Sequence, residues 1–252
     1  MSTLVKDRAV VLRTFDFGES STIAVALMRD HGKVRLLAKG ARKKNSPYLG
    51  RLRTGNLVEV VFYYKEHRGL QLLREVSSES FDMPGRSDFE RLCIFQAGLE
   101  VIDRATIERE SDAGQFMALE AFIVGLPSCP DPWAAFFTLE VQLLKRLGFY
   151  PDLTGCSRCG RAAAGASLVV DTASGSVTCV SCCGRGDLKL TEETCEILGR
   201  MERAGSQAMT DITLDRAMRR RVGTLLHNLF LHHIDGYRLP YALRLLKEDE
   251  AQ

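Results

Sequence analysis

Residues 21–38 read STIAVALMRDHGKVRLLA, two runs rich in β-branched and aliphatic residues on either side of the turn-forming Asp30-His31-Gly32. Runs of this length with such a turn between them are typical of a β-hairpin. The sequence therefore predicts strands over residues 21–27 and 33–38. The hairpin also indicates that the N-terminal third of the chain is built from strands.

Similar runs occur on both sides of the hairpin. Residues 9–12 (AVVL) precede it, and residues 57–63 (LVEVVFY) and 70–73 (LQLL) follow it, the last two separated by a turn over residues 65–69. Together they predict five short strands, with a long loop over residues 40–56 between the third and the fourth. This layout favours a small barrel of the oligonucleotide/oligosaccharide-binding (OB) type, which closes its sheet and leaves no exposed edge.

Beyond the strands, apolar residues recur every three to four positions, the period of an amphipathic helix. Two helices are predicted from two sets of apolar residues, first Leu92, Phe95, Leu99 and Ile102, and then Phe116, Leu119, Phe122 and Leu126. A third is predicted over residues 133–147 after Asp131-Pro132, and its apolar residues on several faces place it at the centre of a bundle. Thr191 is predicted to open a fourth helix, and Thr213 a fifth that ends at Gly236.

The composition is that of an ordinary globular protein. The chain has 252 residues, of which 45% are hydrophobic and 26% are charged, and this excludes disordered and collagen-like proteins. No apolar run is long enough to span a bilayer, and the first eight residues contain no apolar signal core. We therefore expect a soluble, cytoplasmic protein.

Positive charge is concentrated in the N-terminal part. Residues 1–80 hold 15 Lys and Arg against 8 Asp and Glu, a net charge of +7, whereas the remainder carries −5. Between His31 and Val58 there is no acidic residue, and eight basic residues lie in this acid-free segment: Lys33, Arg35, Lys39, Arg42, Lys43, Lys44, Arg51 and Arg53. A charge run is commonly only a solvated face, but so long a stretch of one sign on a barrel and its loop favours DNA binding by these residues.

Aromatic residues close to the basic segment are candidates for stacking on bases. Tyr48, Phe62, Tyr63 and Tyr64 lie in or just after it, and OB barrels that bind single strands use such side chains. At least half of the four are expected to pack in the barrel core instead.

Four of the eight cysteines form two Cys-x2-Cys pairs, Cys156 with Cys159 and Cys179 with Cys182, separated by 19 residues. Each pair aims two thiolates at one point, and a soft tetrahedral ion accepts two such pairs, so one zinc ion is predicted. Because four thiolates leave no position open for water, the zinc is expected to be structural. Two alternatives remain: Cys183 replaces Cys182 as the fourth ligand, or the pairs form a redox dithiol.

Motifs of common enzymes are missing from the sequence. There is no Walker A sequence, no Gly-x-Gly-x-x-Gly after a strand and no Gly-x-Ser-x-Gly. His227, His232 and His233 are expected on one helix as amphipathic or core residues, and the carboxylates are dispersed. Three further cysteines are expected to be buried thiols, namely Cys93, Cys129 and Cys195. The chain is therefore expected to be a binding protein and not an enzyme.

Several stretches resemble the RecO family of bacterial recombination mediators. They are AVVL at 9–12 followed by GESS at 18–21, GK at 32–33 leading to AKGARK at 38–43, LLKRLGFYPDL at 143–153 before the first cysteine pair, and GSVTC at 175–179. The resemblance spans nearly the whole chain. It implies an N-terminal OB domain, a helical domain and a zinc finger.

The residue patterns and the resemblance together predict an α+β, multidomain chain. An N-terminal OB-fold β-barrel is followed by an α-helical bundle domain with an inserted four-cysteine zinc finger. The expected boundaries are residues 1–80 for the OB-fold nucleic-acid-binding domain, 81–152 plus 187–252 for the helical domain, and 153–186 for the zinc finger.

The resemblance also implies a non-enzymatic role in recombinational DNA repair, in the RecF pathway. A family member would bind single- and double-stranded DNA, anneal complementary strands, work with RecR, and help RecA onto DNA coated by single-strand binding protein (SSB). It would contact the C-terminal tail of SSB, engage RecA and RecF indirectly, bind no membrane, and be cytoplasmic and nucleoid-associated.

Two functions from other classes stay open. One is a zinc-containing scaffold that acts only through protein contacts, against which the acid-free segment argues. The other is a zinc-dependent nucleic-acid enzyme, against which ligation by four thiolates argues, because such a site is closed to substrate.

Overall fold

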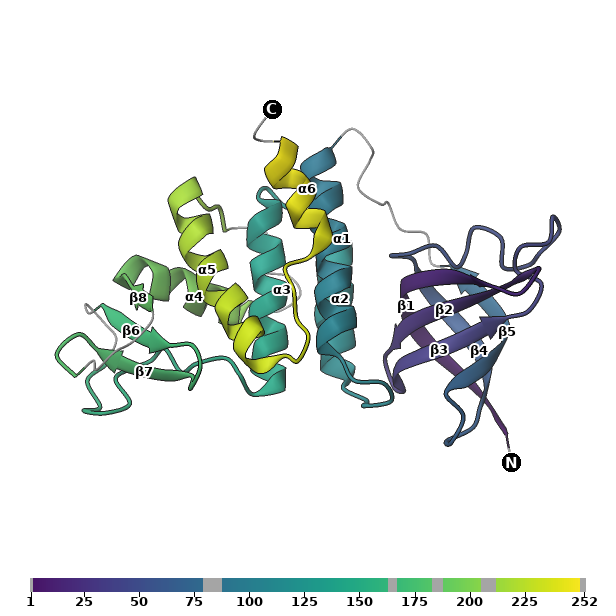
Figure 1. Ribbon diagram of the computed structural model, residues 1–252, viewed down its shortest axis with the longest axis horizontal. Helices are drawn as coiled ribbons and strands as arrows, with labels where there is room; N and C mark the ends of the chain where they lie inside the picture. Colours follow the sequence, from purple (N-terminus) through teal and green to yellow (C-terminus); the bar gives the residue numbers. More distant parts are fainter. Residues whose placement is uncertain (1, 79–87, 163–166, 183–187, 205–211, 250–252) are drawn as a thin grey trace. The chain divides into compact units, whose positions relative to one another are not determined.

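The computed structural model describes residues 2–78, 88–162, 167–182, 188–204 and 212–249 (Figure 1). The chain divides into two compact units, and each is formed from two segments. Unit 1 consists of residues 1–85 and 99–127, and unit 2 of residues 86–98 and 128–252, so that the division falls within helix α1 (Phe89–Ala105). Strands dominate unit 1 and helices dominate unit 2, so the fold is α+β.

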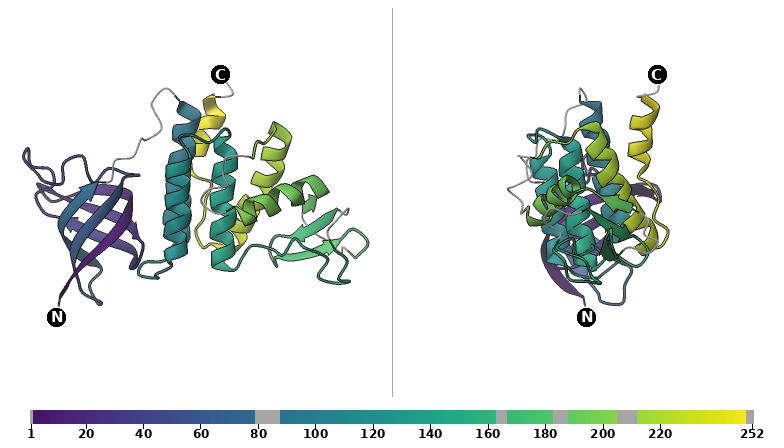
Figure 2. Two further views of the ribbon diagram at one scale, coloured as in Figure 1. Left: turned by 180° about the vertical axis from the view of Figure 1, so that it is seen from behind. Right: turned by 90° about the vertical axis from the view of Figure 1, so that its left-hand side faces the viewer.

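Five strands of unit 1 form a closed barrel (Figures 1 and 2). They are β1 (Thr3–Phe17), β2 (Ser21–Met28), β3 (Gly32–Ala38), β4 (Leu57–Tyr64) and β5 (Leu70–Ser78). Their order is β1-β2-β3-β5-β4, with β4 pairing back to β1. All neighbours are antiparallel except β3 and β5, which are parallel. All five predicted strands are present.

The first strand is much longer than predicted. The sequence indicates a strand over residues 9–12, whereas β1 starts at Thr3, pairs with β4 along its first half and pairs with β2 along its second. A register shift between Val11 and Arg13 bends the strand, which lets one strand serve both neighbours. Charged residues interrupt the apolar pattern, but backbone pairing continues through them.

The last strand of the barrel shows the same effect. The apolar run predicts an end at Leu73, yet β5 continues to Ser78. Arg74 and Glu75 are exposed, and Glu75 still pairs in register with Val61 of β4. Because Arg74 and Glu75 are charged and exposed, the hydrophobic pattern alone does not predict that the strand continues through them.

Side chains that alternate along the strands fill the barrel interior with aliphatic residues and Phe62. Ala24, Ala26 and Met28 of β2 point inward, so Val25 and Leu27 face outward, and they too are buried. Helix α2 (Ala113–Gly125) packs against β1 and β2. The outer face of this part of the barrel is thus covered by helical segments of unit 1.

In its described residues, unit 2 combines the first part of α1 and four further helices with a small sheet. The helices are α3 (Pro132–Leu147), α4 (Glu192–Arg203), α5 (Arg216–His233) and α6 (Tyr241–Asp249), and the strands are β6 (Leu168–Asp171), β7 (Ser176–Cys179) and β8 (Leu188–Leu190) in the order β7-β6-β8. Helix α3 is buried along most of its length and contacts α4 and α5, which confirms its predicted central position. Asp131 caps its start by accepting from the amides of Trp133 and Ala134.

Two predictions at the C-terminal end are wrong. Helix α5 does not begin after Thr213, because Asp215 is the capping residue and accepts from the Met218 amide at 2.7 Å. It ends at His233, before the predicted end at Gly236. The sequence reading also misses α6, a short helix that follows Pro240 and buries Ala242, Leu243 and Leu246.

Candidate nucleic-acid interface and metal centre

The acid-free segment forms β3 and the long loop over residues 39–56, called here the basic loop. Backbone hydrogen bonds fold it into successive turns, as where the Lys43 amide donates to the Gly40 carbonyl at 3.1 Å. All six basic residues of the loop are exposed: Lys39, Arg42, Lys43, Lys44, Arg51 and Arg53. Within the described part of the chain, no ion pair involves Lys39, Lys43 or Lys44. The loop therefore presents free positive charge to solvent.

Arg42 fastens the basic loop to the turn between β1 and β2. Its backbone amide donates to the Ser20 carbonyl at 2.9 Å, and its guanidinium donates to the Asp16 carboxylate at 2.7 Å and to the Gly18 carbonyl. This side chain is thus partly neutralised. Arg42 holds the loop in place and contributes less to its net field than the neighbouring lysines.

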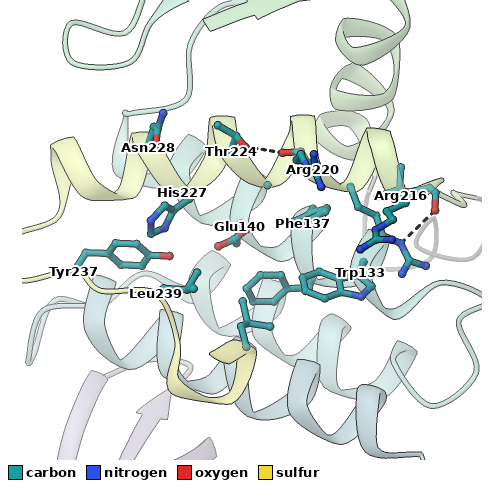
Figure 3. A pocket seen from close by; sticks show the side chains of 15 residues that line it. Trp133, Phe137, Glu140, Arg216, Arg220, Thr224, His227, Asn228, Tyr237 and Leu239 are labelled. Carbon is teal, nitrogen blue, oxygen red and sulfur yellow. Dashed lines mark hydrogen bonds between the residues drawn. The ribbon is translucent and has the colours of Figure 1, made fainter. Parts of the chain in front are cut away.

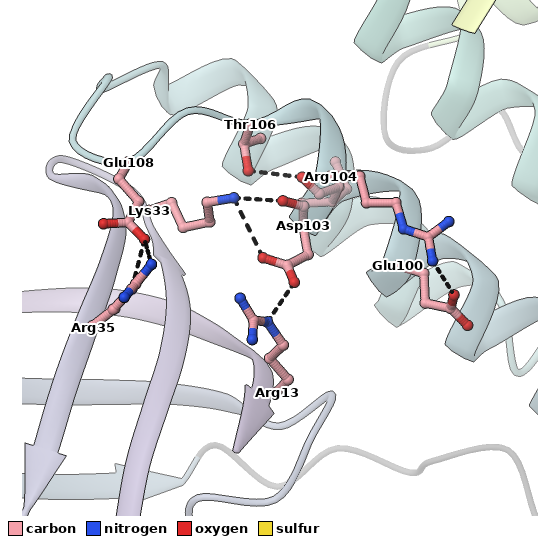
Figure 4. Close-up of polar contacts among 9 residues, drawn as sticks. Arg13, Lys33, Arg35, Glu100, Asp103, Arg104, Thr106 and Glu108 are labelled. Carbon is pink, nitrogen blue, oxygen red and sulfur yellow. Dashed lines mark hydrogen bonds and ion pairs between the residues drawn. The ribbon is translucent and has the colours of Figure 1, made fainter. Parts of the chain in front are cut away.

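Lys33 is predicted to bind DNA, but it is only 8% exposed. Its ammonium donates to the backbone carbonyl of Asp103 and lies 3.3 Å from Asp103 Oδ1 (Figure 4). The same carboxylate accepts from Arg13 Nε at 2.5 Å. Asp103 therefore joins the end of α1 to β1 and β3, and Lys33 does not face solvent as a phosphate ligand would.

Arg35, the other basic residue of β3, also forms an ion pair with an acidic residue of unit 1. Its Nη2 lies 2.5 Å from Glu108 Oε1 (Figure 4). The segment around Glu108 runs beside β3, where a parallel bridge joins it to Lys33. At Gly32, whose φ is +64°, a Cβ would lie 2.2 Å from the Glu110 carbonyl oxygen, so only glycine fits. The end of α1 and its connection to α2 thus neutralise the basic residues of β3; Lys33 is also buried there, whereas Arg35 stays exposed.

Most of the predicted stacking residues pack in the barrel and are not free to contact bases. Phe62 is fully buried, and Tyr64 is half-buried in edge contact with it. The Tyr48 hydroxyl donates to the carbonyls of Leu73 and Arg74, and its ring packs against the core. Tyr63 alone of the four is exposed, at 36%.

Two other aromatic residues, which the sequence reading missed, are exposed at the end of β1. Phe15 is 39% exposed and Phe17 is 49% exposed. The alternation in TFDFG at 14–18 is the signal that could have found them, because it continues a strand with both rings on one face.

The four predicted cysteine ligands converge. Cys156 and Cys159 lie in a turn that precedes β6, and Cys179 and Cys182 lie at the end of β7 and just after it. All four sulfurs lie within 4.8 Å of one another, and the sulfurs of Cys159 and Cys179 are 3.9 Å apart. A tetrahedral ion with Zn–S bonds of about 2.3 Å places its sulfurs about 3.8 Å apart. The four could therefore hold a metal ion. Cys183, the alternative ligand, lies outside the described residues.

Two hydrogen-bonded turns aim the sulfurs. The Gly160 amide donates to the Cys156 carbonyl, and the Cys182 amide donates to the Cys179 carbonyl, both at 2.9 Å. The backbone amide of Cys179 lowers the pKa of the Cys156 thiol to about 6, whereas the neighbouring sulfurs of Cys179 and Cys159 raise the pKa of Cys182 to about 12. Four thiolates this close together repel one another, and a bound cation would relieve that repulsion.

Unit 2 contains a cavity of about 940 Å³ bounded by α3, α5 and residues 237–243 (Figure 3). Its apolar lining comes from Trp133, Phe136, Phe137, Leu214, Leu239 and Leu243. Its polar lining comes mainly from Glu140, Arg216, Arg219, Arg220, Thr224, His227, Asn228 and Tyr237. Such a mixed cavity suits an elongated ligand with both an apolar and an anionic part.

Charged groups of the cavity divide into exposed cations and a buried acid. Arg216 and Arg220 are exposed, whereas Arg219 lies 3.3 Å from the Asp131 carboxylate. Glu140 of α3 is only 3% exposed, and burial raises the pKa of its carboxyl well above the ordinary value. The cavity thus combines accessible guanidinium groups with a carboxyl group whose pKa is raised by burial.

The remaining cysteines behave largely as predicted. Cys93 and Cys129 are buried, and Cys195 is half-buried, so burial is complete for only two of the three.

Among the described residues, no helix is long and apolar enough to cross a membrane.

Two family models match the chain along most of its length. The family described as Recombination protein O N terminal matches residues 1–81, and the one described as Recombination protein O C terminal matches residues 86–240.

Curated proteins named DNA repair protein RecO are similar over most of both chains. The protein from Pelobacter propionicus is 30% identical, over 92% of this chain and 97% of its own. The one from Exiguobacterium sp. is 27% identical over 93% and 91%, and the one from Cutibacterium acnes is 29% identical over 84% and 87%. Because the two family models match residues 1–81 and 86–240, this chain belongs to the RecO family of DNA repair proteins.

Proposed function

We propose that this chain is a DNA-binding recombination mediator that catalyses no chemical step itself. The observation that carries the proposal is the basic loop, which exposes six cations in a segment without acidic residues. The loop belongs to a barrel with the strand order β1-β2-β3-β5-β4, which suits an OB fold. Lys39, Lys43, Lys44, Arg51 and Arg53 contact phosphates of single- or double-stranded DNA, and Arg42 holds the loop.

Annealing follows from neutralised phosphates. Two complementary strands repel each other through their backbones, and a surface that neutralises several phosphates lowers this repulsion while the bases stay free to pair. No hydrolysis energy is needed, so annealing proceeds without ATP. In the repair pathway this activity is combined with RecR and helps RecA onto SSB-coated DNA, with RecF engaged indirectly.

A salt titration of DNA binding tests the proposal. The chain is expected to bind single- and double-stranded oligonucleotides of unrelated sequence with affinity that falls steeply with salt, and to anneal complementary strands without ATP. Binding that is weak at low salt, or annealing that requires ATP, would contradict the proposal.

The cysteine cluster is proposed to hold one structural zinc ion. Four thiolates fill a tetrahedral shell, so Cys156, Cys159, Cys179 and Cys182 leave no position for a substrate. The short strands β6 and β7 bring the pairs together, and their buried aliphatic side chains are Leu168, Val169, Val170 and Val177. Four such side chains make a small core, which favours a stabilising role for the metal. We further propose a zinc finger over residues 153–186, an OB domain over 1–80 and a helical domain over 81–152 with 187–252. Of the helical domain, residues 99–127 belong to the same compact unit as the barrel.

The cavity of unit 2 is proposed to hold the C-terminal tail of SSB, which is acidic and ends in a hydrophobic residue. Its aromatic wall at Trp133 and Phe137 suits an apolar side chain, and the exposed Arg216 and Arg220 suit carboxylates. Charge and shape complementarity support this assignment.

Two other functions are less well supported. A scaffold that acts through protein contacts alone has no use for an exposed cationic loop, and strong salt-dependent DNA binding would exclude it. A zinc-dependent nucleic-acid enzyme needs an open metal position, and annealing without any DNA cleavage would exclude it.

Because the proposed role is on DNA, we propose that the protein is cytoplasmic and associated with the nucleoid.

A further inference from the structure

The end of β1 carries two exposed aromatic side chains on one face. The register with β2 sets Phe15 opposite Ile23 and Phe17 opposite Ser21. Residues two apart on a strand project to the same side, here the outer face of the barrel. Phe15 and Phe17 are 39% and 49% exposed, so folding leaves a large part of each ring in water. Arg13, two residues earlier, lies on the same face.

Cationic groups lie beside these rings. The guanidinium carbon of Arg13 is 5.3 Å from the centre of the Phe15 ring. Arg42 ties the basic loop to the turn that directly follows Phe17. Lys39 starts that loop at the end of β3, next to Ala38, whose partner in β2 lies one residue from the partner of Phe17. Arg13 and Arg42 are themselves paired with Asp103 and Asp16, so among the described residues Lys39 supplies the unpaired positive charge at this corner of the barrel, where it meets the flat apolar surface of the two rings.

This corner of the barrel differs from the part that the helical segments of unit 1 cover. The basic residues of β3 are neutralised there by Asp103 and Glu108, and the apolar side chains of β2 are buried. A nucleic acid that follows the cations must run along the basic loop, and Phe15 and Phe17 lie beside that path.

We propose that Phe17, with Phe15 next to it, stacks on bases, and that this corner binds single-stranded nucleic acid in preference to duplex. The inference rests on the proposed DNA-binding function and names the residues that would distinguish the two forms of nucleic acid. A ring can stack only on a base that has left its duplex partner, whereas phosphates are present in both forms.

The spacing of the rings supports a drawn-out single strand. Residues two apart on a strand are separated by roughly 6.6 Å along it. Successive bases on one strand of a duplex rise by about 3.4 Å, so neighbouring bases can meet the two rings only when the strand is stretched. The lysines of the loop then hold the phosphates on either side.

The test compares two substitutions of the same residue. Phe17→Leu keeps apolar bulk and removes the flat ring, whereas Phe17→Trp keeps a flat ring. With a fluorescent oligothymidine, Phe17→Leu is expected to lower affinity about tenfold, which is the loss expected when roughly one base no longer stacks. Phe17→Trp is expected to keep the original affinity. Because neither change alters charge, the slope of affinity against salt should stay the same. Affinity for a matched duplex should also be unchanged.

Two further measurements separate stacking from a structural role. An oligonucleotide with abasic sugars has phosphates but no bases, so it should bind the original protein and Phe17→Leu equally. The only tryptophan of the original chain is Trp133, so Phe17→Trp adds a fluorophore at the corner, and single-stranded DNA should quench the added emission. Phe89→Leu is the matched control, because Phe89 is an exposed phenylalanine of α1 that belongs to unit 2 and not to the barrel.

The outcomes distinguish failure of this inference from failure of the proposed function. If Phe17→Leu and Phe15→Leu both bind single strands like the original protein, while replacement of Lys43 and Lys44 weakens binding, stacking is wrong and the DNA-binding loop stands. If Phe17→Leu weakens duplex and single-strand binding equally, the preference for single strands is wrong. If none of these variants changes binding, the proposed interface fails as a whole.

Discussion

The ammonium group of Lys33 lies 3.3 Å from a carboxylate oxygen of Asp103, and both side chains are less than a fifth exposed. Arg13 shares this carboxylate, so one acidic residue neutralises two cations of the barrel. Lys33 lies in the acid-free segment, yet it stabilises the barrel through this ion pair and is not available to bind a phosphate.

We therefore expect Asp103→Asn to destabilise the protein without improving DNA binding at Lys33. The substitution leaves a nearly buried ammonium without a counter-ion, which costs on the order of 1–3 kcal/mol. Chemical unfolding should show this decrease in stability. Glu100→Gln, on the same helix and outside the Lys33 contact, is the control and should stay close to the original stability. Equal stability of Asp103→Asn and the original protein would contradict the role assigned to the pair.

Neutralising Lys39, Lys43 and Lys44 together is expected to weaken DNA binding for every sequence. On single strands the slope of log affinity against log salt should fall by about 0.7 for each phosphate that is no longer neutralised, or about 2 for all three. Removing three charges at Lys145, Arg146 and Lys189 of unit 2 is the matched control. If both triple variants change the slope equally, a diffuse charge effect accounts for binding and the loop has no special part.

Replacing Cys156 or Cys179 by Ser is expected to abolish stoichiometric zinc and to lower stability. Each change removes a thiolate from a closed site, and metal binding contributes on the order of 10 kcal/mol to modules of this kind. Elemental analysis and limited proteolysis measure the two effects. Cys195→Ser, outside the cluster, should keep one zinc ion per chain. A metal-free original protein that is equally resistant to protease would overturn the structural role.

Glu140 gives a pH-dependent prediction. Its folded-state pKa is raised by burial, so the folded protein holds a proton that the unfolded chain releases above its ordinary pKa of 4.5. The free energy of unfolding should therefore fall as pH rises from that value through the folded pKa. Glu140→Gln removes this dependence, so its stability relative to the original protein should be greater at pH 8 than at pH 5. Urea unfolding at both values tests it, and an unchanged difference would rule out a neutral Glu140.

The cavity of unit 2 predicts a dependence on the SSB tail. Arg216→Glu with Arg220→Glu should weaken binding of an acidic tail peptide and slow annealing of SSB-coated strands, while bare strands anneal at the original rate. Arg238→Glu, an exposed residue that does not line the cavity, is the control. Equal annealing rates on intact and tail-truncated SSB coats would exclude docking of the tail.

Local features of this fold were accessible from the sequence because short-range physics determines them. The turn at Asp30-His31-Gly32 and the spacing of the cysteine pairs each depend on neighbouring residues, and the structure has both where the pattern puts them. The cap at Asp131 likewise follows from residues next to it.

Features that depend on distant partners were not accessible. Lys33 is 70 residues from Asp103 along the chain, so its burial cannot be read from the acid-free segment. Thr213 and Asp215 are both residues that favour a helix start, so the sequence does not decide between them, and in the structure the cap is Asp215. Phe15 and Phe17 were overlooked because β1 was expected to end before them.

The turns within the basic loop have a consequence for the entropy of binding. The amides of Lys43, Ser46 and Leu49 each donate to the carbonyl three residues earlier, and Asn56 closes the loop by donating to the carbonyls of Gly50 and Arg51. A loop ordered in this way gives up little backbone freedom when a ligand arrives. Association with DNA should therefore resemble the docking of a preorganised surface, and its heat-capacity change should lack the large component that accompanies coupled folding.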